Sequence, residues 1–253
     1  MSELSLLLIG FSHAGALRVA QLARVERKAA TSQLTTIFLF PKYDPLLKVT
    51  DGKHTLHEDI EPDLRRTVEE LKPQFIIGAF WGNQNYFPST ANSPRRFDFV
   101  LPSEPDLPTD AAAEIVPYDL MLGFVRDHFT LVGRLIAATQ KITRLPLYLL
   151  PAPPPVDDLS AISGGKFDVQ MESLVAEHGF APGWLRYKFW RPCHSVHQEK
   201  AAAAKVEVLP IPAEAVDERG FRRPEHYSKD WIHANAAYGE FMLKQCDALL
   251  ARS

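Results

Sequence analysis

Residues 5–15 read SLLLIGFSHAG, and this stretch decides the class of fold. Residues 5–9 form an apolar run that stops at Gly10, which is typical of a strand buried on both faces of a parallel sheet. Residues 14–28 then carry apolar side chains at helical spacing, with arginines between them. A buried strand that turns at once into a helix of this kind predicts an α/β protein.

The same alternation of strand and helix continues along the chain. Residues 86–118 are rich in proline and have few periodic apolar positions, so we expect a long surface insertion there. The whole order predicts one domain, residues 1–253, with a parallel sheet covered on both sides. We expect strands at residues 5–9, 34–40, 74–80, 145–150 and 205–209, and helices at 14–28, 58–72, 119–142, 167–178 and 231–251.

The composition is that of an ordinary globular protein. The 253 residues are 46% hydrophobic and 23% charged, and the formal net charge is −3. A chain of this length buries a sizeable core without disulfides or metals. Its weak charge offers no basic field that would attract nucleic acid or an anionic membrane.

The cysteines and the hydropathy of the sequence narrow the class of protein further. Cys193 and Cys246 are far apart and form no C-x-x-C pair, so we expect neither a structural metal nor a disulfide. No apolar stretch reaches the roughly 20 residues of a spanning helix. The first residues lack the basic leader and cleavage site of a signal peptide. We therefore expect a cytoplasmic protein without a cofactor.

Ligands of such sheets bind outside the carboxyl ends of the strands, so polar residues at these positions are the candidates for chemistry. Ser12 follows the first strand and precedes a helix, whose N-terminal amides favour developing negative charge. The alternative is that Ser12 only caps this helix. Asn83 follows the third strand, where its amide is able to donate to an oxyanion or simply to form a turn.

A second group of candidates lies near the last predicted helix and after the second strand. Asp230 and His233 are three residues apart, a spacing that places a carboxylate beside an imidazole at a helix entrance. The alternative is that Asp230 caps the helix and His233 is an ordinary first-turn residue. Gly52 offers a backbone N–H as a second oxyanion donor, or else it is a plain turn glycine.

The order and spacing of these residues resemble the SGNH/GDSL hydrolase superfamily. Residues 7–12 (LLIGFS) resemble its first block, Gly52 matches the second, and residues 73–83 (PQFIIGAFWGN) resemble the third. Residues 230–233 (DWIH) match its D-x-x-H block, and the proline-rich residues 149–155 also look like this family. The resemblance implies a flavodoxin-like, three-layer α/β/α fold around a central parallel sheet of about five strands.

The resemblance also implies roles for the candidate residues. Ser12 would be the nucleophile, His233 its base and Asp230 the group that orients the base. The oxyanion would rest on the N–H groups of Ser12 and Gly52 and on the side chain of Asn83. The implied activity is hydrolysis of a small-molecule ester, with deacetylation of a carbohydrate as one case.

Three positions depart from the family pattern. Phe11 stands where the family has Asp, Trp81 where it has Gly, and Gln84 where it has Asp. These changes indicate a divergent branch and leave two alternatives open. One is an O-acyltransferase that uses the same triad, and the other is a catalytically inactive ligand-binding domain. The oligomeric state does not follow from the sequence.

Two histidine pairs and one aromatic segment remain unassigned. His54 with His57, and His194 with His197, have a spacing that suits a metal, but neither pair has a visible third ligand. We therefore expect no metal site. Residues 184–191 are aromatic and basic, and either form a wall over the site or belong to the core or an oligomer contact.

Overall fold

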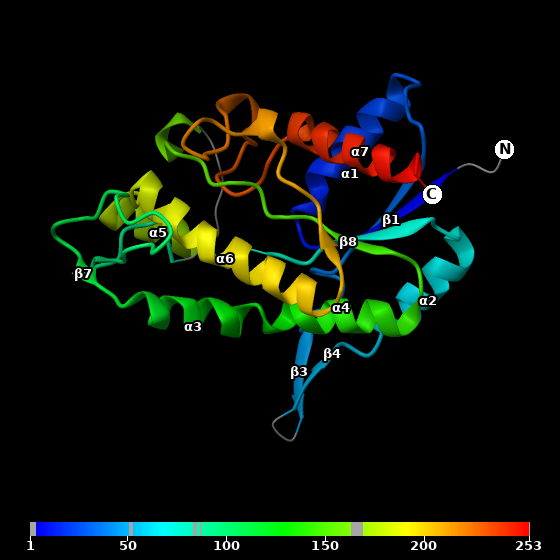
Figure 1. Cartoon of the computed structure of the whole chain (residues 1–253), viewed down its shortest axis with the longest axis horizontal. Coiled ribbons are helices and arrows are strands. Elements are labelled where there is room, and N and C mark those ends of the chain that lie inside the picture. The colour runs from blue at the N-terminus through cyan, green and yellow to red at the C-terminus, as the bar shows by residue number, and fades with distance from the viewer. Residues whose placement is uncertain (1–3, 51–52, 83–84, 87, 163–168, 253) are drawn as a thin grey trace.

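The computed structural model describes residues 4–50, 53–82, 85–86, 88–162 and 169–252, and its centre is a five-stranded sheet (Figure 1). The strand order is β2-β1-β5-β8-β9, and every neighbouring pair is parallel. This is the flavodoxin-like order, and it confirms the predicted parallel sheet. The strands are β1 Ser5–Gly10, β2 Gln33–Phe38, β5 Phe75–Ala79, β8 Leu147–Leu149 and β9 Glu207–Val208.

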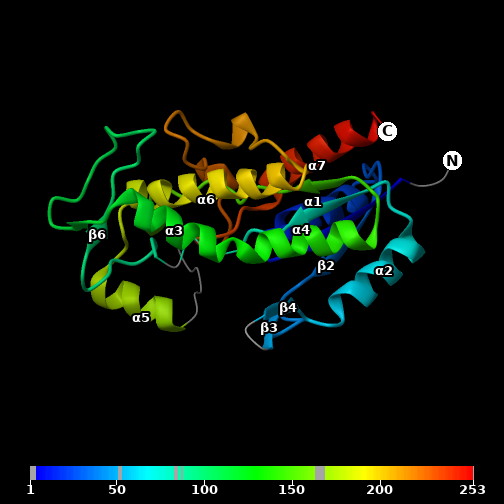
Figure 2. The same ribbon diagram turned by 60° about the horizontal axis from the view of Figure 1, so that its bottom comes forward.

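Helices cover both faces of this sheet and complete the predicted three-layer α/β/α fold (Figures 1 and 2). One face packs against α1 and α7, and the other against α2, α3, α4 and α6. The helices are α1 Ala14–Glu26, α2 Ile60–Leu71, α3 Tyr118–His128, α4 Thr130–Ile142, α5 Val169–His178, α6 Gly183–Ala203 and α7 Ala236–Leu250, with 3-10 turns at Leu159–Ala161, Ala213–Ala215 and Pro224–His226.

The first strand shows why an unbroken apolar run was needed. Leu6 and Leu8 are buried against α1 and α7, while Leu7 and Ile9 are buried on the opposite face. Alternate side chains of a strand point to opposite faces, so a strand between two helical layers needs apolar residues at every position. A Cβ on Gly10 would lie 2.3 Å from the Ala79 carbonyl oxygen, so close approach of two strand ends requires this glycine.

The segment 86–118 is more than a surface insertion. It contains the short parallel pair β6 Phe97–Asp98 and β7 Glu114–Ile115, and Phe99 is fully buried in a separate apolar cluster with residues of α3 and α6. Asp98 also pairs with Lys188 at 2.9 Å, with both side chains almost completely buried. The expectation of a segment without core residues is therefore wrong, because α6 supplies a second apolar surface.

Several predicted element limits also change. The predicted helix 119–142 is two helices that meet at Phe129. The last helix begins at Ala236, because Asn235 caps it by accepting the N–H groups of Ala237 and Tyr238. The antiparallel hairpin of β3 Leu47–Thr50 and β4 Lys53–Leu56 was not predicted.

The long helix α6 was also missed, and the reason is its environment. Trp190, Cys193 and Val196 pack against the sheet, in the apolar cluster that contains Leu7 and Ile9. Leu185 and Phe189 pack in the separate cluster around Phe99. A helix that is buried on several sides lacks the single apolar stripe by which an amphipathic helix is recognised. The aromatic residues 184–191 thus belong to the core, as one of the two interpretations had it.

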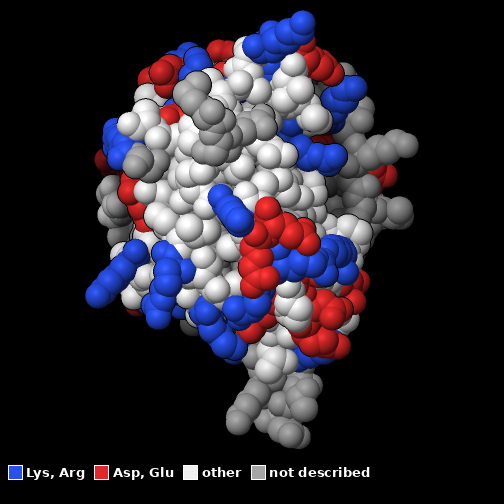
Figure 3. Space-filling model, turned by 90° about the vertical axis from the view of Figure 1, so that its right-hand side faces the viewer, with Lys and Arg blue, Asp and Glu red and all other residues white. Residues whose placement is uncertain are grey.

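Charged side chains of both signs are interspersed on the face at which β1 begins (Figure 3). They are densest over its lower part and also lie along its upper rim, with an uncharged area between the two. This face carries no field of a single sign. Within the part of the chain that the structure describes, none of the helices combines the length and the apolar character needed to cross a membrane.

Candidate active site

Ser12 lies in the turn between β1 and α1, at the carboxyl edge of the sheet. The turn is held by the Phe11 N–H, which donates to the Ala79 carbonyl at 2.9 Å, and by the Gly15 N–H, which donates to the Ser12 carbonyl at 2.9 Å. Ser12 is exposed, and among the described residues neither its Oγ nor its N–H has a hydrogen-bond partner. The first residue before α1 is His13, so Ser12 does not have the capping role that was the alternative.

Asp230 and His233 form a tight pair in the segment before α7. His233 Nδ1 lies 3.0 Å from each carboxylate oxygen of Asp230. Asp230 Oδ1 also accepts the backbone N–H of Ile232 at 2.9 Å and that of His233 at 2.7 Å. The carboxylate therefore fixes the tautomer of His233 with the proton on Nδ1, which leaves a lone pair on Nε2.

Several interactions determine the charge state of Asp230. Burial by itself would raise the pKa of Asp230, but the hydrogen bonds from the His233 ring, the His233 N–H and the Ile232 N–H outweigh it. The pKa of Asp230 consequently lies well below its usual range, and the group is a carboxylate at neutral pH. An ionised carboxylate against Nδ1 is what stabilises an imidazolium when Nε2 takes a proton.

Nε2 of His233 is buried and has no hydrogen-bond partner among the residues that the structure describes. A bond between this atom and Ser12 Oγ is thus not formed in the structure. His13, the neighbour of Ser12, nevertheless has its ring centroid 5.3 Å from that of His233. The turn after β1 and the segment before α7 therefore meet at one edge of the sheet, as the geometry of parallel sheets predicted.

His13 also belongs to this site, and no role was predicted for it. It is buried, and its Nε2 lies 3.4 Å from the Gly82 carbonyl oxygen. Burial, followed by repulsion from His233 and Arg222, lowers the pKa of His13 to about 3, so the ring is neutral. Its position beside Ser12 was the only signal in the sequence, because the contact with His233 joins residues 220 positions apart.

The two remaining oxyanion candidates, Gly52 and Asn83, lie outside the described residues, so their roles stay predictions. Gly52 falls between strands β3 and β4, and Asn83 directly follows Gly82. The buried Gly82 is described, and through its carbonyl it contacts the His13 ring. The loop after β5 therefore reaches the edge at which Ser12 lies.

The other histidines are not arranged as a site. His197 is fully buried beside Trp81 with ring centroids 5.5 Å apart, and burial followed by the proximity of His194 lowers its pKa to about 3. His57 accepts the Asp59 N–H at 3.3 Å, and nothing is described of the His54 side chain. Across the described ranges, no group of three His, Cys, Asp or Glu residues is placed to hold a metal ion.

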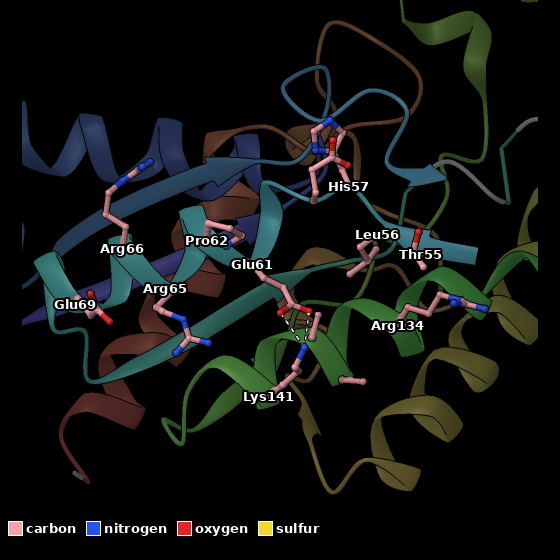
Figure 4. A pocket seen from close by; sticks show the side chains of 13 residues that line it. Thr55, Leu56, His57, Glu61, Pro62, Arg65, Arg66, Glu69, Arg134 and Lys141 are labelled. Atoms are coloured by element: carbon pink, nitrogen blue, oxygen red, sulfur yellow. Dashed lines mark hydrogen bonds and ion pairs between the residues drawn. The ribbon is translucent and has the colours of Figure 1, made fainter. Parts of the chain in front are cut away.

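A pocket of about 830 Å³ lies between α2, α4 and the strand β4 (Figure 4). Its walls carry charges of both signs, and Lys141 pairs with Glu61 across it at 3.0 Å. The described lining includes none of Ser12, Asp230 and His233, and it offers no serine or cysteine nucleophile. It is lined by Thr55, Leu56, His57, Glu58, Glu61, Pro62, Arg65, Arg66, Glu69, Arg134, Ala137, Ala138 and Lys141.

Comparison with known proteins finds similarity in structure only. No protein-family model matches the sequence, and no curated protein matches it significantly. The periplasmic domain of a lipopolysaccharide acetyltransferase from Salmonella serovar Paratyphi A has a TM-score of 0.52 at 12% identity, over 99% of this chain and 84% of that one. A GDSL-like lipase from Bacteroides thetaiotaomicron has a TM-score of 0.43 at 11% identity, over 96% and 86%.

An acetyl xylan esterase from Geobacillus stearothermophilus has a TM-score of 0.37 at 12% identity, over 94% of this chain and 90% of that one. The TM-score of 0.52 with the acetyltransferase domain, at 12% identity, shows a shared fold alone. Together with the sheet order, this likeness shows that the chain shares its three-layer α/β/α fold with the acetyltransferase domain.

Proposed function

We propose that the protein is a serine ester hydrolase whose nucleophile is Ser12. The observation that carries the proposal is the Asp230–His233 pair, in which both carboxylate oxygens lie 3.0 Å from Nδ1. Within the described part of the chain, Nε2 has no hydrogen-bond partner. An imidazole held in this way is a general base with its lone pair available. The substrate is a small ester, and acetylated carbohydrates are a class to be tested.

The reaction would proceed in two steps. His233 Nε2 takes the hydroxyl proton of Ser12 as Oγ attacks the ester carbonyl carbon, and the proton then passes to the departing alcohol. Water attacks the resulting acyl-serine, gives a proton to His233 and releases the acid, after which the proton returns to Ser12. The Ser12 N–H, with Gly52 and Asn83, would hold the oxyanion.

The test is the Ser12→Ala variant on an activated short-chain ester such as p-nitrophenyl acetate. We expect turnover to fall to the background rate with an unchanged melting temperature, because the side chain is exposed and small. The matched control is Ser195→Ala, at an exposed serine of α6. Equal activity of Ser12→Ala and the wild type would show that Ser12 is not the nucleophile.

A second candidate function is acyl transfer to an alcohol with the same residues. The observation that favours it is the structural likeness to the acetyltransferase domain at a TM-score of 0.52. Both functions share the acyl-serine and differ only in the acceptor. Product analysis in the presence of a sugar distinguishes the two functions. A transferase forms a new ester on a sugar hydroxyl, and a hydrolase forms the free acid.

A further inference from the structure

The peptide group between Ile232 and His233 is held from outside its own loop. The Tyr86 hydroxyl donates to the Ile232 carbonyl at 3.0 Å, and Arg222 Nη2 donates to the same oxygen at 3.4 Å. On the other side, the N–H groups of Ile232 and His233 both donate to Asp230. The backbone that carries His233 is therefore fixed by three separate parts of the chain.

Tyr86 is itself held within the loop after β5. The Trp81 Nε1–H donates to Asn85 Oδ1 at 3.1 Å, and the Thr90 hydroxyl donates to the Tyr86 carbonyl at 2.7 Å. Tyr86 is only 2% exposed, and burial raises the pKa of its hydroxyl. The hydroxyl thus keeps its proton at neutral pH and remains a donor to the carbonyl.

The same loop touches the Ser12 side of the site. The Gly82 carbonyl lies 3.4 Å from His13 Nε2, and His13 follows Ser12 directly. The His13 ring in turn lies 6.5 Å from the Tyr86 ring and 5.3 Å from that of His233. The loop after β5 therefore contacts both the turn of the predicted nucleophile and the segment of the predicted base.

We propose that Tyr86 is a positioning residue: its hydroxyl fixes the Ile232 carbonyl and so keeps His233 in place at the edge where Ser12 lies. The inference rests on the proposed hydrolase function. Base and nucleophile come from opposite ends of the chain, and a displacement of about 1 Å is enough to cost a large part of the rate. Tyr86 bonds the segment that carries the base, and its ring lies beside His13, the neighbour of the predicted nucleophile.

The test compares two buried tyrosines of the same region. Tyr86→Phe keeps the ring and removes only the hydroxyl that bonds Ile232. Tyr238→Phe removes a hydroxyl that is equally buried but has no hydrogen-bond partner among the described residues. With p-nitrophenyl acetate, we expect Tyr86→Phe to lower kcat about tenfold with KM within twofold. We expect Tyr238→Phe to keep both constants.

Labelling with a fluorophosphonate probe separates the outcomes. If the wild type is not labelled at Ser12, the proposed function fails and the inference falls with it. If Ser12 is labelled, Tyr86→Phe should be labelled about tenfold more slowly, and melting curves should show both variants folded at the assay temperature. Equal kcat and labelling rates in the two variants, or a rise in KM alone, would overturn the role of Tyr86 and leave the function standing.

Discussion

Asp230 illustrates how a single residue acquires its role from its neighbours. Both Asp230 and Asn235 precede α7, and either type is a good helix cap. Asn235 takes the cap by accepting two N–H groups of the first turn. Asp230 is thereby left to accept the N–H groups of Ile232 and His233 and to face the His233 ring. The alternative that Asp230 merely caps the helix is not what the structure shows.

The residue-level prediction concerns the variant Asp230→Asn. The amide keeps the volume, but its NH₂ group would face Nδ1 and force the His233 proton onto Nε2, which removes the base. We expect kcat to fall roughly a thousandfold or more. The control is Glu225→Gln, at an exposed carboxylate nearby. A variant that keeps more than a tenth of the wild-type kcat would contradict the orienting role.

At the scale of elements, the contact between α1 and α7 brings the two ends of the chain together (Figure 1). A Cβ on Gly239 would lie 2.1 Å from the Ala16 carbonyl oxygen, so the two helix backbones approach as closely as a glycine allows. The buried Arg24 bonds Glu240 at 2.9 Å and Asp247 at 2.8 Å. This contact positions the start of α1, and with it the turn that carries Ser12.

The prediction at the scale of elements compares alanine substitutions at two helical glycines. Gly239→Ala pushes a methyl group against helix backbone, and we expect a loss of about 2–3 kcal/mol in the free energy of unfolding. Gly123→Ala lies in α3, and apart from its own helix no atom of the described residues lies within 4 Å of the new Cβ. We therefore expect a gain of about 0.5–1 kcal/mol. Urea unfolding measures both. If the two variants had equal free energies of unfolding, α1 and α7 would be able to move apart at little cost.

For the whole molecule, buried neutral histidines determine how stability responds to acid. His13 and His197 are both buried, and the pKa of each is lowered to about 3, chiefly by burial. An unfolded histidine titrates near 6.5. Between these values the unfolded chain binds more protons than the folded one, so stability is complete above about pH 6.5 and is lost as the pH falls.

We therefore predict that the free energy of unfolding falls steeply as the pH is lowered below about 6. Each of these histidines contributes a slope of roughly 1.4 kcal/mol per pH unit between about pH 6 and pH 4. Urea unfolding at pH 7, 6 and 5 measures the slope. His197→Phe replaces one titrating ring within an aromatic cluster, and we expect it to reduce the slope by one histidine. An unchanged slope in that variant would show that His197 takes up a proton in the folded protein.

Patterns within short stretches of sequence determined much of the fold and part of the candidate site. Three patterns were visible in the sequence: the apolar run of β1, the helical spacing of α1, and the spacing of Asp230 and His233. Burial and local geometry fix the spacing of residues along a strand or a turn of helix, so such patterns appear in the sequence itself. The parallel sheet and its helical layers followed from the order of these patterns.

Only the tertiary structure decided the rest. It showed that α6 is a core helix, that His13 lies against His233, and that Tyr86 holds Ile232. These features arise from contacts between residues far apart in the chain, for which no local pattern exists. The opening stretch of sequence thus determined the strand and the turn that carry Ser12, whereas long-range packing decided which side chains meet there.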